Sequence, residues 1–259
     1  FICTQDLKNE EYINSHYVIM ATKEGQVKKT LLEQYSRPRQ NGIAAITIKE
    51  DDELLEAKLT NGKSQILVAV KSGKLVRFEE SKTRPMGRNA SGVRGITLAD
   101  DKDEVIGMVS VNDMSSEILV VSENGYGKRS SLEDYRITNR GGKGVKTLNI
   151  TDKTGRLVSI NSVTDADDLM IINKSGLTIR MEVSDLRVMG RATQGVRLIN
   201  IKGNDSIAAV TKVMKEEAVE EVEFEDVTAA VLNSDSTSET TDFEDDSDET
   251  TEENEETQE

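Results

Sequence analysis

The chain has 259 residues and a formal net charge of −15, with one cysteine, one histidine and 3% aromatic residues. One cysteine and one histidine exclude an internal disulfide and a zinc site of the usual Cys/His type. The single histidine sits far from any pattern that would support a catalytic triad. No apolar run approaches the roughly 20 residues of a membrane helix, and no signal peptide is found, so we expect a cytoplasmic protein without membrane contact.

Residues 1–15 precede the repeated part of the chain. The apolar run at residues 1–4 and the polar stretch after it are interpreted as the end of a preceding structural unit and a linker. Because the sequence opens at Phe1 and not at a methionine, we expect the chain to be a piece of something longer.

Residues 16–213 repeat one pattern four times. Two sets of glycines recur in step, with 48 to 52 residues between successive members. Self-similarity at such a period is the signature of stacked supersecondary units. We place the units at about 16–63, 64–115, 116–166 and 167–213. The first set is Gly25, Gly73, Gly125 and Gly176, and the second set is Gly42, Gly92, Gly144 and Gly195.

Each unit is predicted to hold four β-strands. It begins with a short apolar run, such as residues 66–70, that ends at the first glycine like a buried strand before a hairpin turn. A second strand with alternating polarity follows, most clearly at residues 177–181. Four strands in a repeated unit predict an all-β, propeller-like fold of four blades. We expect third strands at 43–48, 93–98, 145–150 and 196–201, and fourth strands at 53–59, 104–109, 156–160 and 206–213.

Residues 214–259 are predicted to form a disordered acidic tail. From residue 215 onward the chain has 20 Asp and Glu side chains and one lysine, whereas residues 1–214 carry a net charge of +4. A segment rich in acidic residues, Ser and Thr buries too little apolar surface to offset the entropy lost on ordering. The folded body is therefore mildly basic, although the whole chain is acidic.

Basic residues recur at equivalent positions of the four units. A repeated core position would be apolar, so a repeated arginine indicates a shared surface role. Beside glycines such residues suit phosphate groups, because backbone N–H groups can also approach the anion. The alternative is a solvated surface with Arg–Asp pairs between blades. The candidate residues are Lys28, Lys29, Arg37, Arg39, Arg77, Arg84, Arg88, Arg94, Lys128, Arg129, Arg136, Arg140, Gly141, Gly142, Lys143, Gly144, Lys146, Arg180, Arg187, Arg191 and Arg197.

One basic loop carries a family motif. Residues 138–144, Thr-Asn-Arg-Gly-Gly-Lys-Gly, resemble the gyrase A box, Gln-Arg-Arg-Gly-Gly-Lys-Gly, at five of seven positions. The tracts at 84–96 and 188–198, and the tract Glu-Asp-Asp-Glu-Leu at 50–54, also look like parts of the C-terminal domain of the DNA gyrase A subunit. Because four in-phase units carry these features, residues 1–213 as a whole resemble that domain.

The resemblance implies a β-pinwheel, in which neighbouring blades exchange strands and a basic rim wraps duplex DNA. It also implies a bacterial, nucleoid-associated protein, whose partners in an A2B2 holoenzyme are a second gyrase A subunit together with the gyrase B subunit. That holoenzyme is an ATP-dependent type II topoisomerase that introduces negative supercoils. ATP and magnesium act elsewhere in it, so we expect no cofactor, metal or catalytic residue in this chain. The family disc usually has six blades with the box in the first, so two blades are expected to be missing at the front.

Three alternatives remain open at this point. The equivalent domain of topoisomerase IV is similar, but usually has fewer blades and a degraded box. A protein-binding propeller of the kelch or chromosome-condensation regulator type would repeat Gly-Gly with Trp and Tyr in every blade, whereas this chain has one Gly-Gly and no Trp. A catalytic propeller lacks candidate residues. Few aromatic residues also favour duplex over single-stranded DNA, which binds by stacking.

Overall fold

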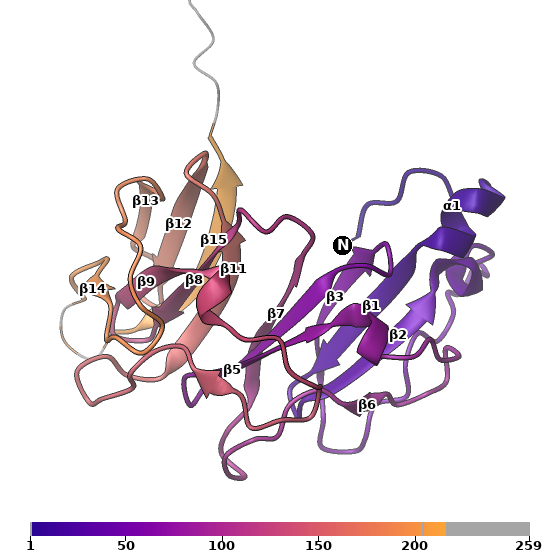
Figure 1. Ribbon diagram of the computed structural model, residues 1–259, viewed down its shortest axis with the longest axis horizontal. Helices are drawn as coiled ribbons and strands as arrows, with labels where there is room; N and C mark the ends of the chain where they lie inside the picture. The colour runs from indigo at the N-terminus through magenta and orange to yellow at the C-terminus, as the bar shows by residue number, and fades with distance from the viewer. Residues whose placement is uncertain (1, 202, 204, 216–259) are drawn as a thin grey trace, which may run out of the picture. The chain divides into compact units, whose positions relative to one another are not determined.

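The computed structural model describes residues 2–201, 203 and 205–215, and the predicted acidic tail from residue 216 onward lies outside them. The described residues form the expected all-β fold, with one short α-helix, α1 (Glu10–Ser15), before the first strand (Figure 1). Three 3-10 turns follow the second strands of the first three units: η1 (Leu32–Tyr35), η2 (Glu80–Lys82) and η3 (Leu132–Asp134).

Each unit contains a hairpin and a later long strand that pairs antiparallel with the first strand of that hairpin. The glycine at each hairpin turn has φ between 77° and 89°, in the left-handed region that favours glycine. The hairpins are β1 (Tyr17–Thr22) with β2 (Gln26–Leu31), β4 (Gln65–Val70) with β5 (Lys74–Glu79), β8 (Glu117–Ser122) with β9 (Tyr126–Ser131), and β12 (Asp167–Asn173) with β13 (Thr178–Glu182). The later strands are β3 (Leu54–Thr60), β7 (Val105–Val111), β11 (Leu157–Val163) and β15 (Ile207–Met214).

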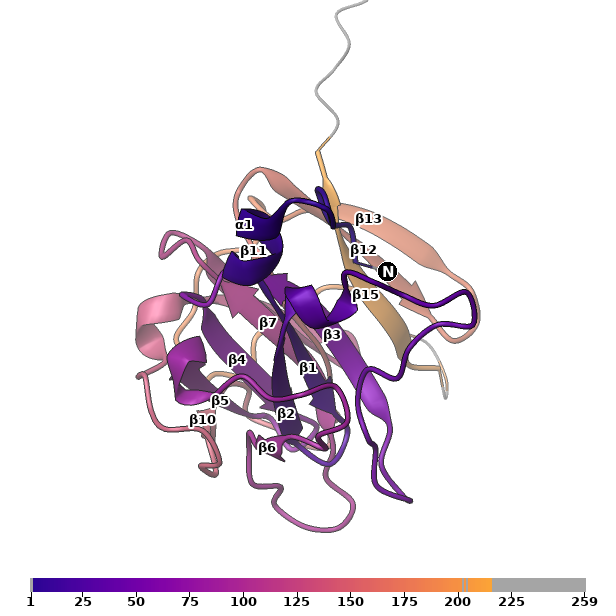
Figure 2. The same cartoon turned by 90° about the vertical axis from the view of Figure 1, so that its right-hand side faces the viewer.

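Neighbouring blades exchange strands, as the resemblance implied. The short strands β6 (Val93–Arg94), β10 (Val145–Lys146) and β14 (Val196–Arg197) each pair with the second strand of the preceding unit. Figure 2 shows β6 beside β2 of the first unit. The resulting sheets have the orders β3-β1-β2-β6, β10-β5-β4-β7, β11-β8-β9-β14 and β13-β12-β15.

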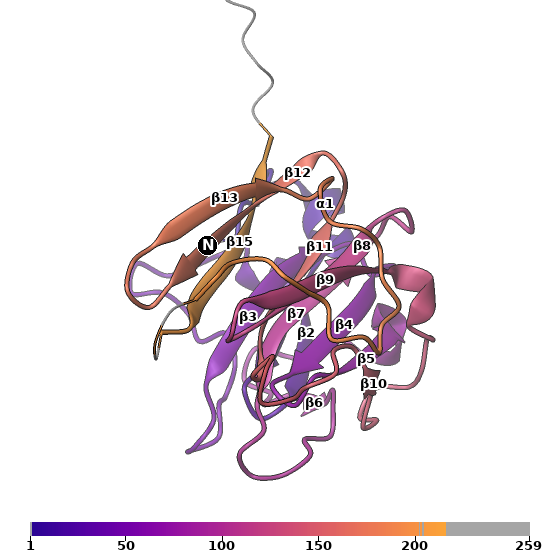
Figure 3. The same ribbon diagram turned by 90° about the vertical axis from the view of Figure 1, so that its left-hand side faces the viewer.

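Three of the strand predictions need correction. The third strands are two residues long where six were expected, and residues 43–48 form no strand. The third strand joins the preceding unit, and the described residues hold no earlier unit that could accept 43–48. At the other end, the fourth sheet has three strands, because no later unit among the described residues provides a short strand for it (Figure 3). The run at residues 1–4, interpreted as the end of an earlier unit, contains no strand in its described part, residues 2–4.

The helix α1 is an element that the sequence interpretation missed. The Asn9 side chain accepts a hydrogen bond from the Tyr12 backbone N–H at 3.0 Å, and Glu10 and Glu11 occupy the first turn. An Asn cap followed by two acids is a helix-start signal, since both satisfy or complement the free N–H groups there. Ile13 is buried and anchors the helix on the first blade.

The hydrophobic core lies between successive sheets. Along β4, Ile66, Val68 and Val70 belong to the core shared with the first sheet, whereas Leu67 and Ala69 belong to the core shared with the third. A strand covered on both faces is apolar at every position. This is why the first strands are continuous apolar runs and do not alternate.

Candidate nucleic-acid interface

Four loops follow the hairpins, and the last three run along the second strand of the preceding unit. We call residues 36–42, 84–92, 136–144 and 187–195 the rim loops. In the last three, backbone bridges join Pro85 to Lys29, Ile137 to Arg77 and Val188 to Arg129. In each case the next backbone N–H donates to the bridged residue's carbonyl, at 2.8 to 2.9 Å. These loops are therefore part of the ordered framework.

Five candidate residues are buried, and their assignment to a surface role needs correction. They follow the hairpin glycine on the second strands, where both faces of the sheet are covered. Their exposed fractions are 0 to 8%, which leaves no surface for a phosphate. The corrected residues are Lys28, Lys29, Arg77, Lys128 and Arg129.

Two of these lysines hold backbone carbonyls of rim loops and neighbouring segments. The Lys28 ammonium donates to the carbonyls of Ala45 and Arg88, and the Lys128 ammonium donates to that of Gly190. Arg88 and Gly190 belong to the rim loops of the following units. Burial lowers the pKa of Lys28 and of Lys128 from 10.5 to about 8. Both side chains therefore connect adjacent blades.

The neighbouring column of cations also connects blades. Lys29 forms an ion pair with the fully buried Glu80 of the next unit at 2.8 Å. The Arg77 guanidinium donates to the carbonyls of Leu132 at 2.6 Å and Tyr135 at 2.8 Å, just before the third rim loop. These bonds satisfy carbonyls at a turn that would otherwise be buried without partners.

The same column continues in the last two units. Arg129 donates to the carbonyl of Leu186 and pairs with Glu117 at 3.0 Å. Its equivalent in the fourth unit, Arg180, has no following unit to enter within the described residues. Arg180 is exposed and pairs with Asp168 at 2.8 Å. Its role as a phosphate ligand stays a prediction.

A third column of arginines is half-buried and links each of the last three rim loops to the segment just after the preceding rim loop. Each guanidinium donates to a backbone carbonyl two residues beyond the second glycine of the preceding unit, and Arg140 also donates its Nε–H to the Lys82 carbonyl at 3.1 Å. A guanidinium has five N–H groups, so further donors remain on each arginine. The pairs are Arg88 with Ala44 at 3.4 Å, Arg140 with Arg94 at 3.1 Å, and Arg191 with Lys146 at 3.0 Å.

The remaining candidate cations are exposed on the rim loops and the short exchanged strands. Among the ion pairs of the described residues, none involves these side chains. The alternative of Arg–Asp pairs between blades therefore fails for this set. Its members are Arg37, Arg39, Arg84, Arg94, Arg136, Lys143, Lys146, Arg187 and Arg197.

The acidic side chains near residues 50–53 and 100–104 bind hairpin turns and a neighbouring lysine. Asp52 accepts the backbone N–H of Glu24 at 2.9 Å, and Asp103 accepts that of Ser72 at 2.9 Å, so each fixes a hairpin turn. Lys71 pairs with Glu104 at 2.8 Å in the same region. Among the described residues, no group of three or more His, Cys, Asp or Glu side chains is arranged to hold a metal ion.

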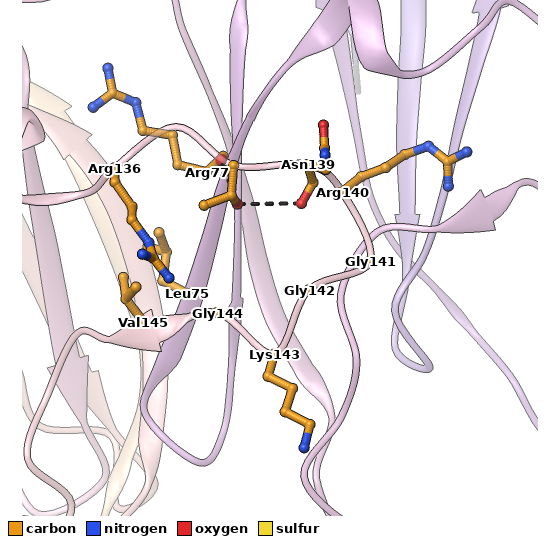
Figure 4. Close-up of a pocket in the computed structure, with 11 residues that line it drawn as sticks. Leu75, Arg77, Arg136, Asn139, Arg140, Gly141, Gly142, Lys143, Gly144 and Val145 are labelled. Carbon is orange, nitrogen blue, oxygen red and sulfur yellow. Dashed lines mark hydrogen bonds between the residues drawn. The ribbon is translucent and has the colours of Figure 1, made fainter.

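The third rim loop contains the two adjacent glycines. Its residues line a hollow of about 480 Å³ together with Arg77 and Leu75, and Arg140 and Lys143 extend from the backbone in different directions (Figure 4). The Gly141 N–H donates to the carbonyl of Gly95 at 2.5 Å, so this N–H is already engaged and its assignment to phosphate is corrected. Glycine is required at 144, where a Cβ would lie 2.6 Å from a backbone oxygen.

Stacked, strand-exchanging blades with exposed cations along their loops define a propeller-type module with a basic edge. The chain belongs to the family described as the DNA gyrase C-terminal domain, beta-propeller, whose family model matches residues 16–61, 65–112, 116–164 and 167–214. This membership sets aside the kelch-type and catalytic propellers. In the described residues, no helix is long and apolar enough to cross a membrane.

Similar proteins include the DNA gyrase A subunit of Staphylococcus aureus. The chain is 44% identical over 239 residues to the protein of strain NCTC 8325 / PS 47, covering 92% of this chain and 26% of that one. It is 46% identical over 230 residues to the protein of strain MRSA252, covering 88% and 25%. The chain thus spans about a quarter of the length of these relatives.

Two solved structures share the fold. The C-terminal domain of DNA topoisomerase IV superposes with a TM-score of 0.73 at 24% identity, covering 77% of this chain and 62% of that one. The DNA gyrase A C-terminal domain gives 0.69 at 23% identity, covering 78% and 67%.

Proposed function

We propose that the rim loops bind duplex DNA along its phosphates and bend it around the blades. The observation that carries this proposal is the set of exposed rim cations that recurs in each unit without carboxylate partners in the part of the chain that the structure describes. Each phosphate neutralised by such a cation releases condensed counterions, which favours binding irrespective of base sequence.

Bending opposes this binding. Curving 20–30 base pairs by 40–90° costs on the order of 1–6 kcal/mol, so a single contact cannot hold the curve. Cations repeated along adjacent blades distribute the contacts along the DNA path. The links between blades through Lys29, Arg77 and Arg129 hold these contacts at fixed separations.

We infer further that this module serves within a DNA gyrase A subunit. The support is the identity of 44% to gyrase proteins that carry this region as about a quarter of their length. In this proposal the holoenzyme contains a second A subunit together with the B subunit, resides with the chromosome in the bacterial cytoplasm, and introduces negative supercoils with ATP hydrolysed in the B subunit. A topoisomerase IV protein is the second candidate, because its C-terminal domain has the same fold.

The direct test uses the chain as it stands. In the first experiment, linear duplex DNA is titrated with the chain at 50 and 200 mM salt. In the second, a nicked plasmid is sealed while the chain is bound, and the protein is then removed. The proposal expects affinity to fall steeply with salt and the linking number to shift with bound chain. Binding that ignores salt, or an unchanged linking number, would contradict it. The intact A subunit, mixed with the B subunit, should then supercoil with ATP, which a topoisomerase IV protein would not do.

A further inference from the structure

Each rim loop carries an apolar residue directly after its first arginine. We call these four residues, Pro38, Pro85, Ile137 and Val188, the apolar column. Ile137 is 47% exposed and Val188 is 48% exposed, and both prolines are also exposed. Ile137 and Val188 thus each expose about half of their surface, at a loop position that the last three units repeat.

Three members of the apolar column are held rigidly by the preceding blade. Pro85, Ile137 and Val188 form the backbone bridges to the preceding blade, and the N–H that follows each of them is hydrogen-bonded. Below the loops, Arg77 and Arg129 bind the carbonyls just before the same stretch. Proline and β-branched side chains have few rotamers, so these residues lose little conformational entropy when a partner contacts them.

Folding does not account for this exposure. Single exposed apolar residues are ordinary on protein surfaces. Here, however, the residue stands twelve residues after the hairpin glycine in each of the last three units, and Pro38 lies near the equivalent place in the shorter first loop. An exposed arginine precedes it each time, namely Arg37, Arg84, Arg136 and Arg187. A surface that places a small rigid apolar group beside a cation, once per blade, matches a ligand that alternates charged and apolar groups at its edge.

We propose that the apolar column contacts the deoxyribose walls of the DNA minor groove while the arginines beside it bind the flanking phosphates. The inference rests on the proposed function and deepens it. The minor groove is about 6 Å wide, so one small side chain reaches both sugar walls, whereas the major groove is about twice as wide. Apolar side chains entering the minor groove are an established means of bending DNA. The apolar column would then help to determine how far the DNA bends, whereas the cations supply the attraction to its phosphates.

The test separates apolar contact from charge. We would compare the unaltered chain with the double variant Ile137→Thr, Val188→Thr, which keeps both side chains β-branched and changes no charge. Contact that buries about 30 Å² of apolar surface per residue corresponds to a loss of about tenfold in affinity for linear duplex DNA. The dependence on salt should remain that of the unaltered chain, because no phosphate contact is removed. The linking-number shift per bound chain should decrease.

Two control variants accompany it. Leu177→Thr changes another exposed apolar side chain, 52% exposed, on the fourth hairpin outside the rim loops, and should bind as the unaltered chain does. Ile137→Val, Val188→Ile keeps the column apolar and should restore affinity and linking-number shift. Netropsin, which fills the minor groove, should displace the unaltered chain from an A·T-rich duplex.

The inference is overturned if the Thr variant matches the unaltered chain in affinity and linking-number shift, or if netropsin leaves binding unchanged. The inference is also overturned if the Thr variant differs from the unaltered chain only in the salt dependence of its affinity, because the column would then act only through the neighbouring charges. Failure of the underlying function is distinct: the unaltered chain itself would bind duplex DNA weakly and without salt dependence.

Discussion

Arg77 and Arg136 line the same hollow beside the third rim loop, but they have different tasks. Arg77 is 7% exposed and its guanidinium is used on carbonyls of the next blade, whereas Arg136 is exposed. The buried cation fixes the loop from which the exposed one projects. Removing either would weaken DNA binding, the first through the framework and the second through a lost phosphate contact.

The exposed arginines give a quantitative prediction. The triple variant Arg84→Gln, Arg136→Gln, Arg187→Gln should bind duplex DNA more weakly, and its slope of log affinity against log salt should flatten by up to about 0.9 per lost phosphate contact. Affinities measured between 50 and 200 mM salt give this slope.

The matched control replaces three exposed lysines outside the rim loops, Lys63, Lys102 and Lys174, with glutamine. It changes the net charge by the same amount. If both triple variants flatten the slope equally, the chain attracts DNA through overall charge alone and the rim loops have no special role.

The buried lysines Lys28 and Lys128 predict a pH dependence of stability. Burial lowers both pKa values from 10.5 to about 8. Between these values the unfolded chain binds more protons than the folded one, so the free energy of unfolding should rise with pH from about 8 to 10.5. Urea unfolding of the unaltered chain and of Lys28→Met, Lys128→Met would be compared across this range. The unaltered chain should gain stability relative to the variant, and a difference that stays constant with pH would refute the assignment.

At the scale of the element, local patterns predicted the hairpins and the later long strands to within one to three residues at each end. They overestimated the third strands, because pairing of that segment depends on the preceding unit and not on its own residues. The site shows a similar division. Repeated cations marked the right loops, but β5 is buried at four consecutive positions, Leu75 to Phe78, so alternation could not show that Arg77 points into the protein.

The turn at Gly144 gives a prediction at the same scale. Gly144 has φ of 74°, and a Cβ there would lie 2.6 Å from the Leu75 carbonyl oxygen. Gly144→Ala should therefore destabilise the fold by at least about 1–3 kcal/mol, measured by urea unfolding. Gly190→Ala in the fourth rim loop is the control, because a Cβ there meets nothing within 4 Å. Equal stability of the two variants would contradict the strained geometry.

At the scale of the whole molecule, the charge of the acidic segment should oppose DNA binding. Residues 215–259 carry 20 acidic side chains, whereas residues 1–214 have a net charge of +4. Deleting 216–259 removes a large negative field, so affinity for duplex DNA should increase, most strongly at low salt, where screening is weak. Titration at 50 mM salt tests this, and an unchanged affinity there would show that the segment has no electrostatic influence on the rim.

β6, β10 and β14 each pair with a strand of the preceding unit, so each of these sheets is completed only after the next unit has been synthesised. When the first unit has left the ribosome, β2 is paired with β1 but still lacks its second neighbour, which arrives only with residues 93 and 94 of the second unit. The same delay recurs for β5 and for β9. In a nascent chain the second strand of the newest unit is therefore an open edge, and this edge moves toward the C-terminus as each new unit pairs with the previous one. Protection of that moving edge from pairing with another nascent chain is a demand that this topology places on translation and chaperones.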